Sequence, residues 1–92
     1  MSVSFRLAIV SPKGDHVQDQ VTAVTVPGAD GSFGVLADHA PCVVLLKEGA
    51  IKISKAEGEL VYKIRSGVME VRQGGETQIL VDELRPADVP DD

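Results

Sequence analysis

The chain has 92 residues, a formal net charge of -5, and a composition that is 43% hydrophobic and 25% charged. This length fits one small globular domain with one core. The acidic balance argues against a nucleic-acid partner, because a phosphate backbone requires a basic surface. No apolar run approaches the roughly 20 residues that a membrane-spanning helix needs. The start lacks the pattern of a signal peptide, and a lone cysteine fits a reducing compartment, so we expect a protein that is soluble when isolated.

Short alternating segments, separated by turn residues, follow one another along the chain. In the first of them Phe5, Leu7 and Ile9 fall on one face, which is the period-two pattern of a half-buried strand. No window before residue 82 has a helical period. The spacing predicts an all-β fold, a two-sheet antiparallel β-sandwich or flattened barrel of about ten short strands. The clearest predicted strands are residues 3–9, 20–26, 33–36, 42–46, 50–54, 60–64, 68–72 and 78–81.

Three segments carry more particular predictions. Residues 42–46 are continuously apolar, which is typical of a strand buried on both faces. The pair Gly74-Gly75 predicts a hairpin, because glycine tolerates the positive φ of tight hairpin turns. Residues 84–92 contain two prolines and several acids, so we expect the domain to span residues 1–83 and the remainder to be a frayed tail.

No constellation of residues predicts an enzyme. The glycine-rich run from Gly28 to Gly34 lacks the Gly-Lys-Ser/Thr ending of a phosphate loop and precedes no helix. His39 and His16 have no predicted nucleophile or orienting partner. We therefore predict no catalytic residue, no cofactor and no metal site, and we interpret Cys42 as a small buried hydrophobe.

An ordered set of short motifs resembles the N-terminal domain of the epsilon subunit of F-type ATP synthases. The match extends from about Val3 to Glu83 and comprises Val10-Ser11, Gly31-x-x-Gly34, His39-Ala40-Pro41, Lys47-x-Gly49-x-Ile51-x-Ile53, Ser66-Gly67-x-x-Glu70-Val71 and Leu80-Val81-Asp82. The resemblance implies a β-sandwich that links the gamma subunit to the membrane rotor ring. It implies a non-catalytic part of the rotor's central stalk, which couples ion-driven rotation to ATP synthesis.

The resemblance also implies which residues meet each partner. Contacts with the gamma subunit are expected at Ser11, His39 and Val44. Contacts with the c subunits of the ring are expected at Gly31, Ser32, Gly34 and Asp38. Local roles remain open beside these: His39 can be satisfied within its own loop, Ser11 can serve the turn with Pro12, and Val44 can belong to the core. Ser32 departs from the acidic residue that is frequent in the family at that position.

Full-length members of the family carry a C-terminal helical pair that this chain lacks, so regulation of hydrolysis and ATP binding by those helices are not carried over. A naturally short subunit and an expressed fragment both remain open, and the absence of a helical pattern at the end favours the former. The resemblance implies a peripheral location on the cytoplasmic face of a bacterial inner membrane, reached only through the complex. The alternative function is a free-standing β-sandwich that acts as a binding or adaptor module.

Overall fold

The computed structural model describes residues 4–14 and 16–87. Within these residues, strands and one short 3-10 turn make up the regular structure. The elements are β1 (Phe5–Val10), β2 (His16–Val21), β3 (Ala23–Gly28), β4 (Gly31–Leu36), β5 (Cys42–Leu46), β6 (Gly49–Lys55), β7 (Gly58–Ile64), β8 (Gly67–Val71), η1 (Gln73–Gly75), β9 (Thr77–Val81) and β10 (Arg85–Pro86).

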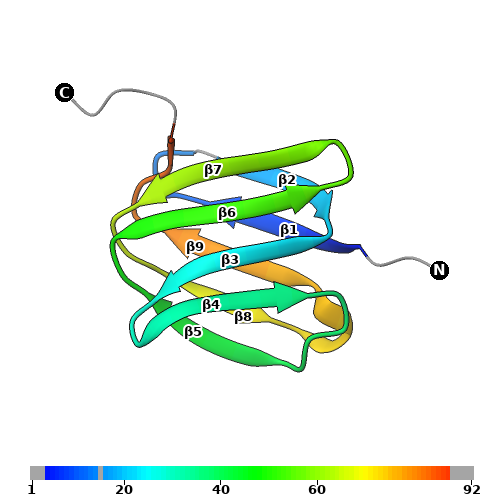
Figure 1. Ribbon diagram of the computed structural model, residues 1–92. Helices are drawn as coiled ribbons and strands as arrows, with labels where there is room; N and C mark the ends of the chain where they lie inside the picture. Colours follow the sequence, from blue (N-terminus) through cyan, green and yellow to red (C-terminus); the bar gives the residue numbers. More distant parts are fainter. Residues whose placement is uncertain (1–3, 15, 88–92) are drawn as a thin grey trace.

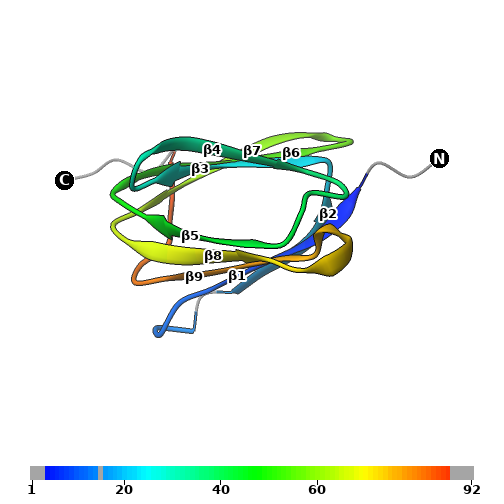
Figure 2. The same ribbon diagram turned by 90° about the horizontal axis from the view of Figure 1, so that it is seen from below.

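The strands, labelled in Figure 1, form two stacked layers, which Figure 2 shows edge-on. The layer drawn above, here called the upper sheet, has the order β4-β3-β6-β7-β10. The lower sheet has the order β5-β8-β9-β1-β2. The layers are continuous through one backbone pair, Gly28 of β3 with Leu46 of β5. The predicted two-sheet sandwich is confirmed, with the addition of one parallel pair between β1 and β9.

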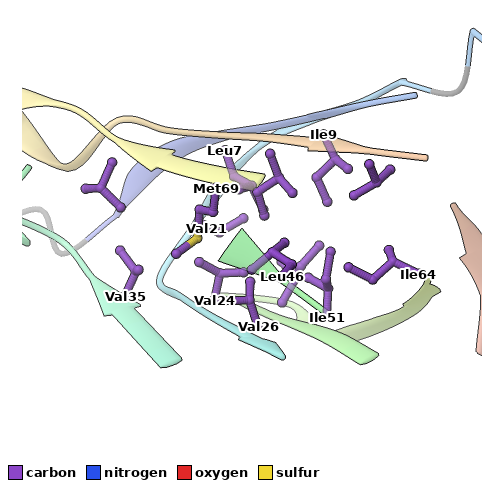
Figure 3. Packing of buried hydrophobic residues seen from close by; sticks show 14 of the residues in the cluster. Leu7, Ile9, Val21, Val24, Val26, Val35, Leu46, Ile51, Ile64 and Met69 are labelled. Carbon is purple, nitrogen blue, oxygen red and sulfur yellow. The ribbon is translucent and has the colours of Figure 1, made fainter. Parts of the chain in front are cut away.

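Alternate residues of both sheets point into a shared core. Leu7, Ile9 and Ile79 of the lower sheet and Ile51 of the upper sheet have no exposed surface, and Val26 is 1% exposed. Figure 3 shows Leu7 and Ile9 of one layer pointing toward Val26 and Ile51 of the other. The core is built mainly from Val, Ile and Leu, and its many β-branched residues favour the extended conformation of strands.

The chain changes sheet at Thr22, and the prediction of one strand over residues 20–26 is therefore wrong. The Thr22 backbone N–H and hydroxyl both donate to the Ser54 carbonyl oxygen, at 2.8 Å and 3.0 Å. This bend lets β2 finish the lower sheet and β3 begin the upper one, as strands do at the corners of packed sheets.

An ion pair joins the two sheets near the bend at Thr22. Lys55 of β6 pairs with Asp19 of β2, and so joins the two layers. The hydrogen bond from Lys55, with a second from the Gln20 backbone N–H, lowers the pKa of Asp19 below its ordinary value. The hydrogen bond with Asp19 raises the pKa of Lys55. Both shifts favour the charged pair.

Two further predictions require correction. β5 is not buried on both faces, because Val43 and Leu45 are each 67% exposed while only Leu46 is buried. The tail does not separate from the domain at residue 84, because Arg85 and Pro86 pair with β7. The rest of the predicted frayed tail, residues 88–92, lies outside the described residues. The predicted hairpin at Gly74-Gly75 is confirmed, since both have positive φ and β8 pairs antiparallel with β9.

Candidate interaction surfaces

An apolar row crosses the outer side of the lower sheet. The cross-strand register aligns Leu45 with Val68, Val68 with Leu80, and Leu80 with Val10, across β5, β8, β9 and β1. These residues point outward because their chain neighbours, such as Met69 and Ile79, fill the core. Leu45 is 67% exposed and Leu80 is 48% exposed. We call this row, Val10, Leu45, Val68 and Leu80, the lower-sheet face.

Polar side chains border the lower-sheet face on one side. The Arg72 guanidinium donates to the Gln78 side-chain oxygen at 2.7 Å and to the Glu70 carboxylate at 3.4 Å. Glu70 and Gln78 are cross-strand neighbours in the row next to Val68 and Leu80. An apolar centre with a satisfied polar border is the usual anatomy of a protein interface. Contiguous apolar side chains on one face of a soluble protein indicate a partner that covers them.

The upper sheet has a mixed outer side. Thr25, Lys52 and Ser54 are polar, whereas Leu36 of β4 is 64% exposed and lies opposite Ala23. The lower-sheet face differs because its apolar residues form a row across four neighbouring strands. This continuous row makes the lower sheet the candidate docking surface.

A groove of about 360 Å³ separates the start of β4 from β5. Phe33 of β4 lies in it together with Val43, Val44 and Leu45 of β5. The His39 ring packs edge-to-face against Phe33, with 5.6 Å between the ring centroids. Two of the predicted gamma-contact residues, Val44 and His39, therefore both lie beside Phe33, which is not among the residues predicted from the sequence.

Ser11 lies apart from this groove. It is 5% exposed, directly after β1, and its carbonyl oxygen accepts a hydrogen bond of 3.1 Å from the Gly14 backbone N–H. The side chain is thus enclosed, and the local role in the turn is present in the structure. A contact between Ser11 and a partner stays a prediction.

The predicted ring-contact residues are spread along β4 instead of forming one loop. Gly31 and Ser32 lie at the start of the strand, beside a turn of two residues, and Gly34 lies in its middle. Asp38 follows the far end of β4, in a left-handed conformation with φ of 67°. Gly31 has φ of 132°, a conformation that glycine adopts without strain.

Asp38 and His39 form a compact corner with the β8–β9 turn. A Cβ atom on Gly75 would lie 2.9 Å from the Asp38 backbone nitrogen, so the two turns are in close contact. His39 Nδ1 lies 2.7 Å from the Ala40 carbonyl oxygen. His39 therefore has a hydrogen-bond partner within its own loop, which is one of the two roles that the sequence left open. Its ring also contacts Phe33.

Nothing in the described residues assembles into a reaction centre. Over residues 4–14 and 16–87, no cluster of three or more His, Cys, Asp or Glu side chains is placed to hold a metal ion. No helix of this part is long and apolar enough to cross a membrane. The surfaces described above are suited to binding.

The fold and its surfaces define a small β-sandwich interaction domain. The family model of the ATP synthase, Delta/Epsilon chain, beta-sandwich domain matches residues 4–87. The chain therefore belongs to this family, and the family resemblance found in the sequence is confirmed.

Relatives and solved structures agree with this assignment. The ATP synthase epsilon chain of Sulfurovum sp. (strain NBC37-1) is 45% identical over 76 residues, covering 82% of this chain and 59% of the relative. That of Rickettsia bellii is 33% identical, covering 97% of this chain and 90% of the relative. This chain thus spans about three fifths of the Sulfurovum relative's length.

A chain in the cryo-EM structure of the Euglena gracilis mitochondrial ATP synthase, OSCP/F1/c-ring in rotational state 1, is similar to this chain. The TM-score is 0.89 at 26% identity, covering 99% of this chain and 58% of that chain. A chain of the Tetrahymena thermophila mitochondrial ATP synthase central stalk/c-ring structure matches with a TM-score of 0.73 and 15% identity, which is a likeness in fold alone.

Proposed function

We propose that this chain is a non-catalytic subunit of the central stalk of a rotary ATP synthase. In this role it links the gamma subunit to the membrane ring of c subunits and couples ion-driven rotation to ATP synthesis. Membership of the delta/epsilon family and the similarity to a chain of an F1/c-ring assembly support the proposal. It acts by binding, and it is peripheral, at the cytoplasmic face of a bacterial inner membrane.

The apolar lower-sheet face is the observation that carries the proposal. Leu45 and Leu80 are large side chains left exposed in the isolated chain. Covering such a row with a partner removes apolar surface from water, which makes the free energy of association more favourable. We assign this face to the gamma subunit. Val44, an expected gamma contact, points to the opposite side of β5 from Leu45 and packs against the core. It therefore meets a partner only through the groove that it lines with Phe33, on which His39 packs.

The ring contact is proposed at the other side of the groove, around the β3–β4 turn. Gly31 and Ser32 lie next to this turn, and Gly34 continues the surface along β4. Asp38 lies beyond the far end of the strand, so it joins this contact only if the ring meets β4 along its whole length. Two separate surfaces on one rigid sandwich suit a subunit that transmits torque, because packed interiors resist deformation.

Calorimetric titration of the full chain into the purified gamma subunit from the same source tests the proposal. The expected result is saturable binding of one chain to one gamma subunit. Absence of binding at micromolar concentrations by a folded sample would overturn the proposed function and favour a free-standing binding module. The His39→Ala and Ser11→Ala variants, titrated alongside, test the two expected contacts individually.

A further inference from the structure

The strand β4 has one free edge. Among the residues that the structure describes, β4 pairs with β3 alone, over Ala23–Gly28 and Gly31–Leu36. Figure 2 shows β4 at the open side of the sandwich, above β5, which belongs to the other layer. A strand edge of this kind presents unpaired backbone donors and acceptors.

The register of the β3–β4 hairpin identifies the groups on this edge. Gly28 and Gly31 flank the turn and face each other, which makes them a hydrogen-bonded pair, as in hairpins with two-residue turns. Hydrogen-bonded pairs alternate with non-bonded pairs in an antiparallel ladder. Ser32 and Gly34 therefore occupy non-bonded positions, and their N–H and C=O groups point away from β3. Pro27, which has no N–H, lies opposite Ser32 in agreement with this alternation.

None of the usual devices protects this edge. Natural proteins blunt an exposed edge with charged residues, proline or a bulge, but β4 has the sequence GSFGVL, with no charge and no proline. Gly34 has no Cβ and only the Thr25 hydroxyl near that position, at 4.0 Å. A glycine in a strand frequently marks a place where another backbone approaches closely.

The free edge and the lower-sheet face share a boundary. The groove beside β4 is lined by Phe33 together with Val43 and Leu45, and Leu45 is also part of the lower-sheet face. A partner that covers this face thus reaches the groove without interruption. Two exposed carboxylates, Asp30 and Asp38, stand before and after β4, so the edge is uncharged in the middle and acidic at both ends.

We infer that the partner that covers the lower-sheet face also places an extended segment in the groove, where it pairs as an additional strand with the free edge of β4. This inference rests on the proposed function, in which that partner is the gamma subunit. The ring contact then falls on the outer side of the β3–β4 hairpin, to which the Ser32 side chain points because its neighbour Phe33 packs toward the core. The segment is expected to be uncharged and apolar over the length of β4, with a lysine or arginine near each end to face Asp30 and Asp38. Backbone pairing would supply affinity, as in other cases of strand addition to a sheet edge.

A proline and an alanine at the same position separate backbone pairing from side-chain contact. Gly34→Pro removes the outward N–H and leaves the β3–β4 bonds in place, since proline is tolerated where the N–H faces away from the sheet. Gly34→Ala keeps the N–H, and its methyl group fits without strain, since it meets only the Thr25 hydroxyl, at 4.0 Å. Ser32→Pro and Ser32→Ala form a second matched pair, in case the first proline impairs folding.

Each variant is titrated as the full chain into the gamma subunit, after its melting temperature has been checked in isolation. The proline variants are expected to bind about tenfold more weakly, which corresponds to one lost hydrogen bond, while the alanine variants bind within about twofold of the unchanged chain. Amide hydrogen exchange gives an independent readout, because the Ser32 and Gly34 amides are expected to exchange more slowly in the complex.

The outcomes are distinguishable from failure of the proposed function. If the unchanged chain binds gamma but folded proline variants bind equally well, or if the Ser32 and Gly34 amides exchange at unchanged rates, strand addition at β4 is overturned and the stalk role stands. If the unchanged chain does not bind gamma at all, the proposed function and this inference fail together.

Discussion

Replacing Leu45 and Leu80 together by serine tests whether the lower-sheet face is a binding surface. Fully burying a leucine side chain contributes about 1.5–3 kcal/mol. Leu45 is 67% exposed and Leu80 is 48% exposed in the isolated chain, so covering the exposed remainder of both contributes about 2–3 kcal/mol. The double variant is therefore expected to bind the gamma subunit about 30- to 150-fold more weakly.

The assay is calorimetric titration at fixed salt and temperature, with urea unfolding of each free chain as the check on folding. Exposed side chains contribute little to the stability of the free domain, so the free energy of unfolding is expected to change by less than about 1 kcal/mol. Val61→Ser is the matched control, because Val61 lies on β7 of the upper sheet, directly opposite the outward-facing Lys52. Unchanged affinity of a folded double variant would refute the assignment of this face, as would an equal loss in the Val61→Ser control.

Three further predictions concern the sandwich itself, each read from chemical unfolding of the free chain. Gly67→Ala places a Cβ atom 2.5 Å from the Leu80 carbonyl oxygen and is expected to cost about 1–3 kcal/mol; unchanged stability would show that the β8–β9 pairing is looser than described. Met69→Ala empties a side chain with no exposed surface and is expected to cost about 2–5 kcal/mol; a change under about 1 kcal/mol would contradict this core packing. Because pairing with Lys55 lowers the pKa of Asp19 in the folded chain, this group stabilises the fold above its ordinary pKa, and the contribution is lost as the pH falls below about 4. Asp19→Asn should flatten this acid dependence, and an identical pH profile for the variant would contradict the role of the pair.

The strands could be predicted from sequence wherever one face is buried and the other solvated. β1 and β8 alternate along their whole length, so their inward residues, such as Leu7 and Met69, could be identified without the structure. Turn residues with a required conformation were equally informative. Gly74 and Gly75 both adopt the positive φ that their position in a hairpin demands.

Long-range arrangement was not visible in the sequence. Thr22 carries no turn signal, and its bend is held by the distant Ser54 carbonyl, so residues 20–26 were predicted as one strand and the earlier part of β2 was not predicted. The parallel pairing of β1 with β9 joins residues about seventy positions apart, such as Leu7 and Thr77, and depends on the completed sandwich. The short β10 likewise depends on an available edge of β7.

The burial of β5 was predicted wrongly for one reason. A continuous apolar run is usually a strand buried on both faces, and β5 was predicted as such. In the structure β5 is the outermost strand of the lower sheet, and its outward residues Val43 and Leu45 remain exposed. The apolar run combines inward residues, Cys42, Val44 and Leu46, which lie in or against the core, with the exposed outward pair. Only the register with Val68 and Leu80 revealed the complete row.

The central claim is that two surfaces of one rigid sandwich meet two different partners. Cysteine-directed cross-linking in the assembled membrane complex tests it most directly, using Leu45→Cys and Ser32→Cys in separate chains that also carry Cys42→Ala. The account predicts that Leu45→Cys gives products with the gamma subunit and none with c subunits, and that Ser32→Cys gives products with c subunits, beside any products with the gamma strand at the β4 edge. Leu45→Cys products with c subunits, or an intact complex in which Ser32→Cys gives no product with c subunits, would contradict it.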